Sequence, residues 1–247
     1  MATPESGLTA GVSVELHVED RRVLVVGGGP VGARRAGSLA NAGARVQVVT
    51  PRRSAALQSL LDESSTAGVG SSVTVQDRAF VEADLDAVDG DAVLMVVTAT
   101  DRPELNARIG ELARARGVLV NRADDGAAGD LTFSAVRQHG PLRVAVSTGG
   151  ASPTVARWAA QRLDDGLEGV LGLDADGLAL LVEVVQEVRD ELGLAGTARG
   201  EAPGMLGGGT RRELVDWRSA LDGIILELIH RGRRAEAKER LLACLSS

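Results

Sequence analysis

A glycine-rich turn between an apolar run and a helical segment is the feature that most constrains how this chain folds. Residues 23–26 are four consecutive aliphatic residues, a pattern typical of a strand that is covered on both faces of a sheet. The turn follows at once as Gly-Gly-Gly-Pro-Val-Gly over residues 27–32, and residues 33–42 predict a helix that Gly43 ends. Residues 46–49 then predict a second strand. These segments form a βαβ unit of about thirty residues, which favours a parallel sheet.

Strands and helices continue to alternate along the first half of the chain. The further elements that the hydrophobic pattern predicts are a helix at 53–62, a loop at 63–72, strands at 73–75, 92–97 and 118–120, and a helix at 104–116. Residues 12–18 alternate apolar and polar side chains, so we expect one more, half-buried strand in front of the turn. The order of elements predicts an α/β fold with a Rossmann-like doubly wound parallel sheet.

The pattern changes after Asn121. Residues 131–136 and 142–146 are two β runs joined by a short loop, which predicts an antiparallel hairpin. Ser152 and Pro153 then mark the beginning of a helix, as its N-cap and its first helical residue. We therefore expect a small α+β segment after the parallel sheet.

The last third of the chain has a helical pattern, which a glycine-rich linker at 194–210 interrupts. After the linker, apolar residues at spacings of three and four predict one face of a helix: Leu214, Trp217, Leu221, Ile224 and Leu228. We expect Trp217 to lie in the core of a helical C-terminal region.

Composition excludes several kinds of chemistry. Cys244 is the single cysteine of the 247 residues, so an internal disulfide or a multi-cysteine metal site cannot form. Tyrosine is absent and Lys238 is the single lysine, which argues against a Tyr–Lys reductase pair, a P-loop lysine and a Schiff-base lysine. Because the chain has only 3 histidines, acid–base chemistry falls mostly to carboxylates.

Charge and hydropathy exclude two kinds of partner. The formal net charge is −7 and no long basic tract is present, so we expect no nucleic acid. No apolar run reaches about 18 residues, so we expect no membrane span. Residues 1–11 carry neither a basic region nor an apolar run, which predicts a cytoplasmic protein without a secretory leader.

The turn itself has the spacing of a dinucleotide-binding motif, G-x-G-x-x-G, with a predicted strand before it and a helix that begins inside it. Glycines let the backbone approach a pyrophosphate, and N–H groups at the helix N-terminus bind its charge. The alternative is a tight βα turn that binds nothing. We expect cofactor contacts from the glycines of the turn, Gly27, Gly28, Gly29 and Gly32.

The end of the second strand leaves the choice of cofactor open. A site for NAD often has an acidic residue there, which binds the ribose hydroxyls, whereas this chain has Thr50, Pro51, Arg52 and Arg53. Two arginines suit a 2′-phosphate, so these residues alone lean slightly toward NADP. The alternative is that both arginines are solvated charges at the start of a helix.

Two further segments should lie at the edge of the sheet where ligands bind. Thr98, Ala99 and Thr100 end one buried strand, and Asp124 and Asp125 follow the next strand. Ligands in a doubly wound sheet sit beyond the carboxyl ends of the strands, so the first segment should line the nicotinamide side. The two carboxylates are the best placed in the chain for proton abstraction or contact with a metal, and the alternative is a solvated acidic turn.

Four segments taken together resemble the sirohaem (siroheme) synthase family, and more narrowly its precorrin-2 dehydrogenase/sirohydrochlorin ferrochelatase members. They are residues 23–32, 98–101, 121–124 and 144–153, in the family's order and spacing. The most specific piece is Ser-Thr-Gly-Gly-Ala-Ser-Pro within the last segment, and the resemblance covers about 12–165.

The resemblance implies an activity and an arrangement of domains. Family members oxidise precorrin-2 to sirohydrochlorin with NAD⁺, and many also insert Fe²⁺ as a second substrate to give siroheme. By this resemblance we expect a Rossmann domain at 12–125, a central dimerisation and substrate segment at 126–168 and a helical C-terminal domain at 169–247. The expected partners are a tetrapyrrole substrate and a second copy of the chain, as a homodimer.

The resemblance also implies roles for residues. Asp124 matches the family's aspartate, which is credited as general base and as a candidate metal contact, and no dedicated metal cage is expected. His139 in the hairpin loop is a weaker candidate, and we expect it to be exposed. The family's NAD contacts fall on the glycine turn, with Pro30 and Val31, and on Pro51 and Arg52 at the end of the second strand.

The implied substrate is a polycarboxylate, so its pocket should be basic despite the negative net charge. Guanidinium groups suit carboxylates, and four arginines cluster in sequence around the hairpin: Arg122, Arg137, Arg143 and Arg157. Each of them taken singly could equally be a surface charge. The residues expected to bind substrate are Arg122, Arg143, Thr148, Gly149, Gly150, Ser152 and Arg157. Thr148 replaces a serine that is modified in some family members, so we do not expect its modification.

Two other functions stay open at this point. One is an NADP-dependent reductase of another substrate, which would use Arg52 and Arg53. The other is a non-catalytic nucleotide-sensing module that controls a partner through its helical C-terminal region. The predicted hairpin and the segment at 147–153 argue against the sensor, which needs neither.

Overall fold

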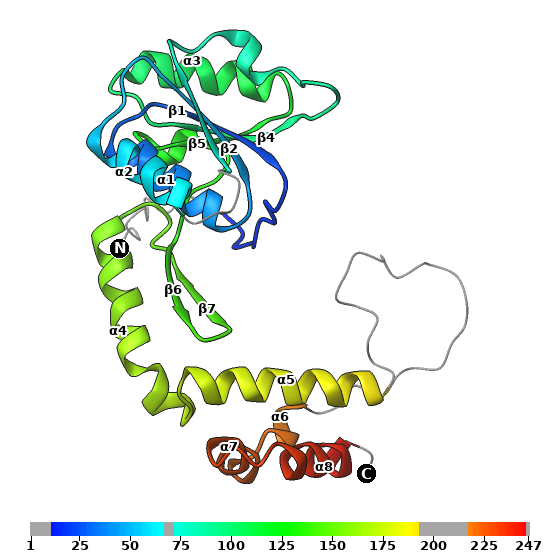
Figure 1. Cartoon of the computed structure of the whole chain (residues 1–247). Helices are drawn as coiled ribbons and strands as arrows, with labels where there is room; N and C mark the ends of the chain where they lie inside the picture. The colour runs from blue at the N-terminus through cyan, green and yellow to red at the C-terminus, as the bar shows by residue number, and fades with distance from the viewer. Residues whose placement is uncertain (1–10, 67–71, 193–216, 246–247) are drawn as a thin grey trace, which may run out of the picture. The chain divides into compact units, whose positions relative to one another are not determined.

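The computed structural model describes residues 11–66, 72–192 and 217–245 (Figure 1). The chain divides into two compact units. The first unit is Met1–Phe133 with Gly149–Ala151, and the second is Ser134–Thr148 with Ser152–Ser247. Every helix in the described ranges is too short or too polar to span a membrane.

A five-stranded parallel sheet forms the centre of the first unit, in the order β3-β2-β1-β4-β5. Its strands are β1 (Arg22–Val26), β2 (Arg45–Thr50), β3 (Val73–Asp77), β4 (Val93–Thr98) and β5 (Leu119–Arg122). Strands β2 and β3 lie on one side of β1, and β4 and β5 lie on the other side. The strand order therefore reverses between β1 and β4, which is where doubly wound sheets bind their ligands.

Helices cover both faces of this sheet (Figure 1). The helical elements are α1 (Pro30–Asn41), α2 (Ala55–Thr66), α3 (Pro103–Arg114) and two short 3₁₀ turns, η1 (Glu82–Leu85) and η2 (Gly126–Ala128). Strand side chains alternate between the faces, so Val23 and Val25 pack with α1 and α2 while Leu24 and Val26 pack with α3. Because both faces are covered, the strands read as continuous apolar runs. The predicted Rossmann-like α/β fold is confirmed.

The predicted strand at 12–18 is wrong. The segment forms no strand, and the side chains of Val12 and Val14 are 87% and 79% exposed. Val18 is its one buried residue, in the core beneath α1. Alternating apolar residues make a strand only where a neighbouring strand offers hydrogen-bonding groups, and the edges of this sheet are β3 and β5. The helix expected at 53–62 is α2, which begins and ends later than predicted.

The second unit begins with a two-stranded antiparallel sheet and a long helix. The sheet is the hairpin of β6 (Ala135–His139) and β7 (Leu142–Val146), and α4 (Pro153–Leu171) packs against it. The hairpin is confirmed, but its first strand begins later than residue 131, because Leu131 is hydrogen-bonded to β5 instead. Ser152 is the N-cap of α4 as predicted, since its Oγ accepts a hydrogen bond from Val155 N over 3.3 Å.

The remaining described residues of the second unit are helical. The helices are α5 (Ala175–Glu191), α6 (Trp217–Ala220), α7 (Gly223–His230) and α8 (Arg234–Leu245). They share a core of their own that includes Leu173, Val184, Val188, Ile225, Ile229 and Leu241. Trp217 packs against this core, as predicted. The linker predicted at 194–210 lies outside the described residues.

Candidate functional site

The glycine turn is shaped by the strand ends beside it. Gly27 has a φ of +118°, and a Cβ there would lie 2.4 Å from the carbonyl oxygen of Ala99. A Cβ on Gly28 would lie 2.7 Å from Thr50 Cγ2, and a Cβ on Gly32 would lie 2.0 Å from the Gly27 oxygen. The turn therefore needs glycine at these three positions for its own packing, whether or not it binds a ligand.

Gly29 differs from the other glycines of the turn. A Cβ added there would meet nothing within 4 Å, so the backbone borders open space. Gly29 is the N-cap of α1, and as a glycine it has no side chain that could cap the helix. Pro30 begins the helix, and its first turn contains no acidic residue. Pro30 and Val31 are exposed. The turn thus offers open space and the positive end of a helix dipole, which suits the pyrophosphate of a dinucleotide.

The two arginines considered for a 2′-phosphate differ in their surroundings. Arg53 Nη2 lies 2.5 Å from Asp77 Oδ2, and Arg53 Nε lies 2.7 Å from Asp77 Oδ1. This bidentate contact lowers the pKa of Asp77 and commits Arg53 to a carboxylate. Pro51 and Arg52 are exposed, while Thr50 is buried and its Oγ1 donates a hydrogen bond to the Arg52 oxygen over 2.8 Å.

The residues at the end of β4 lie beside the glycine turn. Ala99 N donates a hydrogen bond to Val26 O over 2.8 Å, which fixes the segment next to the end of β1. Thr98 is completely buried, and its Oγ1 has no hydrogen-bond partner among the described residues. Thr100 Oγ1 donates to Asn106 Oδ1 over 2.6 Å, and Asn106 Nδ2 donates to Thr100 O over 3.1 Å.

The proposed base and one proposed substrate residue form an ion pair with each other at the end of β5. Arg122 Nη2 lies 2.6 Å from Asp124 Oδ2, and Arg122 Nε lies 3.2 Å from Asp124 Oδ1. The two side chains are 12% and 24% exposed. The hydrogen bond from Arg122 lowers the pKa of Asp124, so this carboxylate is ionised at neutral pH, as a proton acceptor must be.

Asn106 belongs to this site although no motif pointed to it. Its side chain is fully buried on α3, where it is hydrogen-bonded to Thr100, and its amide also lowers the pKa of the Asp124 carboxylate. It therefore anchors the end of β4 and acts on the carboxylate that follows β5. Its sequence signal is an amide at an apolar position of an amphipathic helix, in line with Ile109, because a buried amide needs polar partners.

The other candidate acid–base residues have different surroundings. The exposed Asp125 caps η2, since its Oδ1 accepts hydrogen bonds from two backbone N–H groups at 3.2 and 3.3 Å. His139 ends β6 and is half-buried, with Nδ1 3.8 Å from Asp164 Oδ1, so the expectation that it is exposed is wrong. Across the described ranges, no three or more His, Cys, Asp or Glu side chains gather where they could hold a metal ion.

The arginines predicted in the second unit lie on its hairpin and on α4. Arg143 on β7 and Arg157 on α4 are exposed. Arg137 on β6 donates hydrogen bonds to the Gln161 side chain on α4, at 3.2 Å from Nε and 3.1 Å from Nη2. Arg137 therefore joins the hairpin to the helix, while the other two carry charge on the surface of the unit.

The segment before α4 is held by its own hydroxyl groups. Thr148 Oγ1 donates a hydrogen bond to Ser152 O over 3.1 Å and accepts one from Ser152 N over 2.9 Å. Gly149 and Gly150 both have positive φ, of 61° and 88°. The threonine and serine side chains predicted to bind substrate thus also shape the turn that starts the helix.

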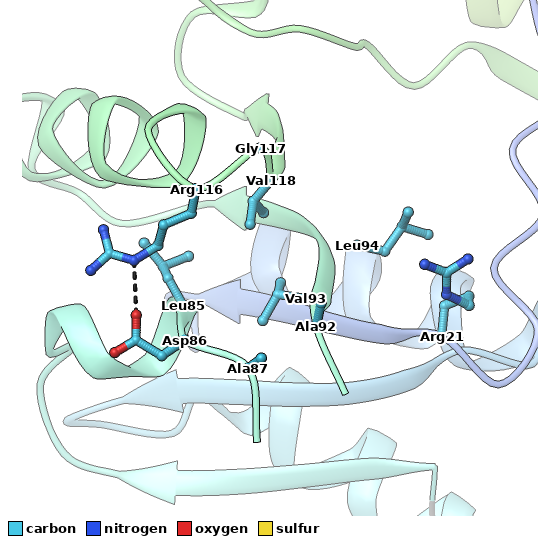
Figure 2. Close-up of a pocket in the computed structure, with 10 residues that line it drawn as sticks. All are labelled: Arg21, Leu85, Asp86, Ala87, Ala92, Val93, Leu94, Arg116, Gly117 and Val118. Atoms are coloured by element: carbon cyan, nitrogen blue, oxygen red, sulfur yellow. Dashed lines mark hydrogen bonds and ion pairs between the residues drawn. The ribbon is translucent and has the colours of Figure 1, made fainter. Parts of the chain in front are cut away.

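A hollow of about 360 Å³ lies at the amino ends of the strands of the parallel sheet, opposite the end with the glycine turn (Figure 2). It is lined by residues at the beginning of β4, such as Ala92 and Val93, and by Gly117 just before β5. Arg116 Nε donates a hydrogen bond to Asp86 Oδ1 over 2.9 Å at its rim. Because these are the amino ends of the strands, the hollow is separate from the glycine turn and from Asp124.

Comparison with known proteins shows which families the chain is similar to. Residues 14–135 match a family model described as NAD(P)-binding. The siroheme synthase of Nitrosococcus oceani is 31% identical over 230 residues, which are 93% of this chain and 43% of that protein. The siroheme synthase of Pseudomonas aeruginosa is 34% identical over 225 residues, which are 91% and 42% of the two chains. The chain therefore spans about two fifths of the length of these relatives.

A solved structure has the same fold. It is titled SirC, precorrin-2 dehydrogenase, and it superposes with a TM-score of 0.54 at 24% sequence identity, covering 96% of this chain and 100% of that one. Its likeness supports the Rossmann-like sheet with the added small sheet and C-terminal helices. The resemblance to the siroheme synthase family is confirmed, since the chain is similar to these siroheme synthases over nearly its whole length.

Proposed function

We propose that the chain is an NAD-dependent precorrin-2 dehydrogenase, which oxidises a reduced tetrapyrrole to sirohydrochlorin. The observation that carries the proposal is an open, uncapped glycine turn and an ionised, half-buried carboxylate at the same edge of one sheet. The names of the relatives support a tetrapyrrole as the substrate.

The surroundings of Arg53 support NAD over NADP. A 2′-phosphate at Arg53 would compete with Asp77, which holds the guanidinium in a solvent-exposed bidentate ion pair, whereas the ribose hydroxyls of NAD need no cation there. Arg52 alone is then left for a phosphate. This removes the reason for which two arginines, taken from the sequence, leaned toward NADP.

The chain's residues divide the chemistry between binding and proton transfer. Bound NAD⁺ would supply the acceptor of a hydride. The backbone of the glycine turn would hold its pyrophosphate, and the segment 98–100 would line the path toward the nicotinamide. Asp124 would accept the proton that the macrocycle loses together with the hydride, and then release it to water. The substrate thus loses one hydride and one proton.

Iron insertion would fall on the same carboxylate, which would remove pyrrole protons while Fe²⁺ enters as a substrate. Among the described residues, no three potential metal ligands gather in one place. Adding Fe²⁺ or Co²⁺ to the oxidised product tests this second reaction.

We propose that a second copy of the chain covers the exposed apolar surface of the hairpin and α4. Strands β6 and β7 pair only with each other in the described residues, and a lone two-stranded sheet is of marginal stability. Six large apolar side chains are exposed on these elements: Val136, Leu142, Val155, Trp158, Leu163 and Val170. A twofold interface would bury the same patch of both copies. Trp158→Arg should then yield a monomer in analytical ultracentrifugation, and a wild-type monomer would contradict the proposal.

The test of the oxidation is a spectroscopic assay with purified protein. Precorrin-2 and NAD⁺ should give the absorbance of sirohydrochlorin and NADH in equal amounts, and NADP⁺ should be the poorer acceptor. Asp124→Ala should abolish turnover and leave NAD⁺ binding intact. Asp125→Asn is the matched control, because it changes a neighbouring carboxylate that caps η2, and it should keep its activity. Full activity of Asp124→Ala would refute the assignment of the base.

A further inference from the structure

Arg35 carries a charge for which the described residues of the first unit supply no counter-ion. Its side chain is half-buried on α1, and its Nε is buried without a hydrogen-bond partner in the described ranges. Burial lowers the pKa of the guanidinium to about 10, and the neighbouring charge of Arg34 acts in the same direction. No described carboxylate offsets these two effects. A buried charge without a counter-ion costs free energy, so its presence calls for an explanation.

A fixed aromatic ring orients this guanidinium. Arg35 Cζ lies 4.1 Å from the centre of the Phe133 ring, which itself packs on the core beneath α1. The segment that carries the ring is tied to β5, because Leu131 N donates to Val120 O over 3.3 Å and Leu131 O accepts from Asn121 Nδ2 over 2.9 Å. The ring covers one face of the guanidinium plane, so an acceptor would approach its N–H edge.

Arg35 lies on the helix that begins at the glycine turn. It lies in the second turn of α1, about 7.5 Å along the helix axis from Pro30, which begins the helix at the glycine turn. The residue that anchors the ring segment, Asn121, lies on β5 directly before Arg122, and Asp124 follows that strand. Through Phe133, Arg35 is thus in contact with the segment that β5 anchors.

We propose that Arg35 binds a carboxylate of the tetrapyrrole substrate. The inference rests on the proposed function, since precorrin-2 is a polycarboxylate. A guanidinium offers two parallel N–H donors to a carboxylate, and a ligand there would supply the missing counter-ion. The competing explanation is purely structural, in which the arginine only packs on Phe133.

The experiment compares Arg35→Met with Arg34→Met. Methionine at position 35 keeps an apolar side chain over the ring but removes the charge, while Arg34 is exposed on the same helix and serves as the matched control. Arg35→Met should raise KM for precorrin-2 by about 10- to 100-fold, as expected for one charge-assisted hydrogen-bonded pair, and leave KM for NAD⁺ unchanged. Its Tm should equal or exceed that of the wild type, and Arg34→Met should change neither KM.

A second variant and a second readout separate the possible failures. Arg35→Lys keeps the charge without the paired donors, so its KM for precorrin-2 should lie between those of the wild type and Arg35→Met. Binding of sirohydrochlorin, followed by absorbance without NAD⁺, should weaken in the same order. An active wild type with unchanged KM in both Arg35 variants, or a Tm lowered by several degrees in Arg35→Met with KM unchanged, would overturn the inference alone. A wild type that does not oxidise precorrin-2 would overturn the proposed function, and this inference with it.

Discussion

Replacing Asn106 with alanine should slow the proposed oxidation far more than it weakens the binding of NAD⁺. The amide makes three hydrogen bonds with Thr100, at 2.6, 3.1 and 3.3 Å, and it also lowers the pKa of Asp124. At about 1 kcal/mol for each bond, and with water partly replacing the amide at Thr100, the variant should lose about 2–3 kcal/mol of folding free energy. For a chain of this length that loss corresponds to a Tm lower by about 4–12 °C.

The effect on the reaction has a different origin. Without the amide, Asp124 keeps its ion pair with Arg122 but loses the polar group on α3 that lowers its pKa, and Thr100 beside it loses its anchor. A base displaced by about 1 Å from its working position can cost about 100-fold in rate. We therefore expect kcat to fall by about 10- to 100-fold, while the Kd for NAD⁺ changes by less than about threefold, since the glycine turn is untouched.

A control on the same helix separates positioning from stability. Ile109 is also fully buried on α3, and Ile109→Ala should cost about 2–5 kcal/mol without touching a polar group of the site. Assayed at a temperature well below both melting transitions, it should keep nearly its full kcat. If Asn106→Ala shows the expected loss of Tm but the kcat of the wild type, then Asn106 is a purely structural residue and the reasoning is refuted.

Three further changes test other contacts of the first unit. Asp77→Asn releases Arg53 and should tighten NADP⁺ binding several-fold in a fluorescence titration; an unchanged Kd would remove the argument for NAD specificity. Thr98→Val removes a buried hydroxyl without a partner in the described residues, so it should raise Tm of the free protein, and a lower Tm would reveal a partner. Burial raises the pKa of Asp84, but hydrogen bonds from Arg78 and a backbone N–H outweigh it and lower the pKa. Asp84→Asn should therefore cost about 2 kcal/mol at pH 7. Its deficit in Tm should shrink as the pH falls below about 4, because the stabilisation is present only above the unfolded pKa and is lost through the lower folded one. A deficit that stays constant across this range would show that the charge of Asp84 is not its source.

The parallel sheet could be predicted because its signal is local. A short apolar run such as 23–26, followed at once by a glycine turn, is typical of a strand inside a parallel sheet. The motif also predicts a glycine at position 27, where the close approach of Ala99 leaves no room for a side chain. The failure at 12–18 has the opposite cause. Alternation describes one segment, but a strand also needs a neighbour, and no neighbour is recorded in one sequence.

The roles of charged residues were harder to predict, because they depend on pairs. The sequence predicts separate roles, substrate binding for Arg122 and proton transfer for Asp124. The structure shows that the two side chains are hydrogen-bonded to each other. Arg53 meets Asp77 only because β2 and β3 are in the register that places Thr50 beside that aspartate. The second pairing follows from the register of β2 and β3, which the apolar pattern of one strand does not reveal.

These ion pairs also determine how strongly each arginine of the first unit should bind the carboxylate of a ligand. A ligand carboxylate that binds Arg122 competes with Asp124, so its net gain is only the difference between two ion pairs. The same holds at Arg53, where Asp77 would have to leave. At Arg35 no described carboxylate is displaced, and the Nε of the half-buried side chain is already out of contact with water. A polycarboxylate should therefore gain more affinity from this single guanidinium than from either paired arginine, even though Arg35 lies in no motif.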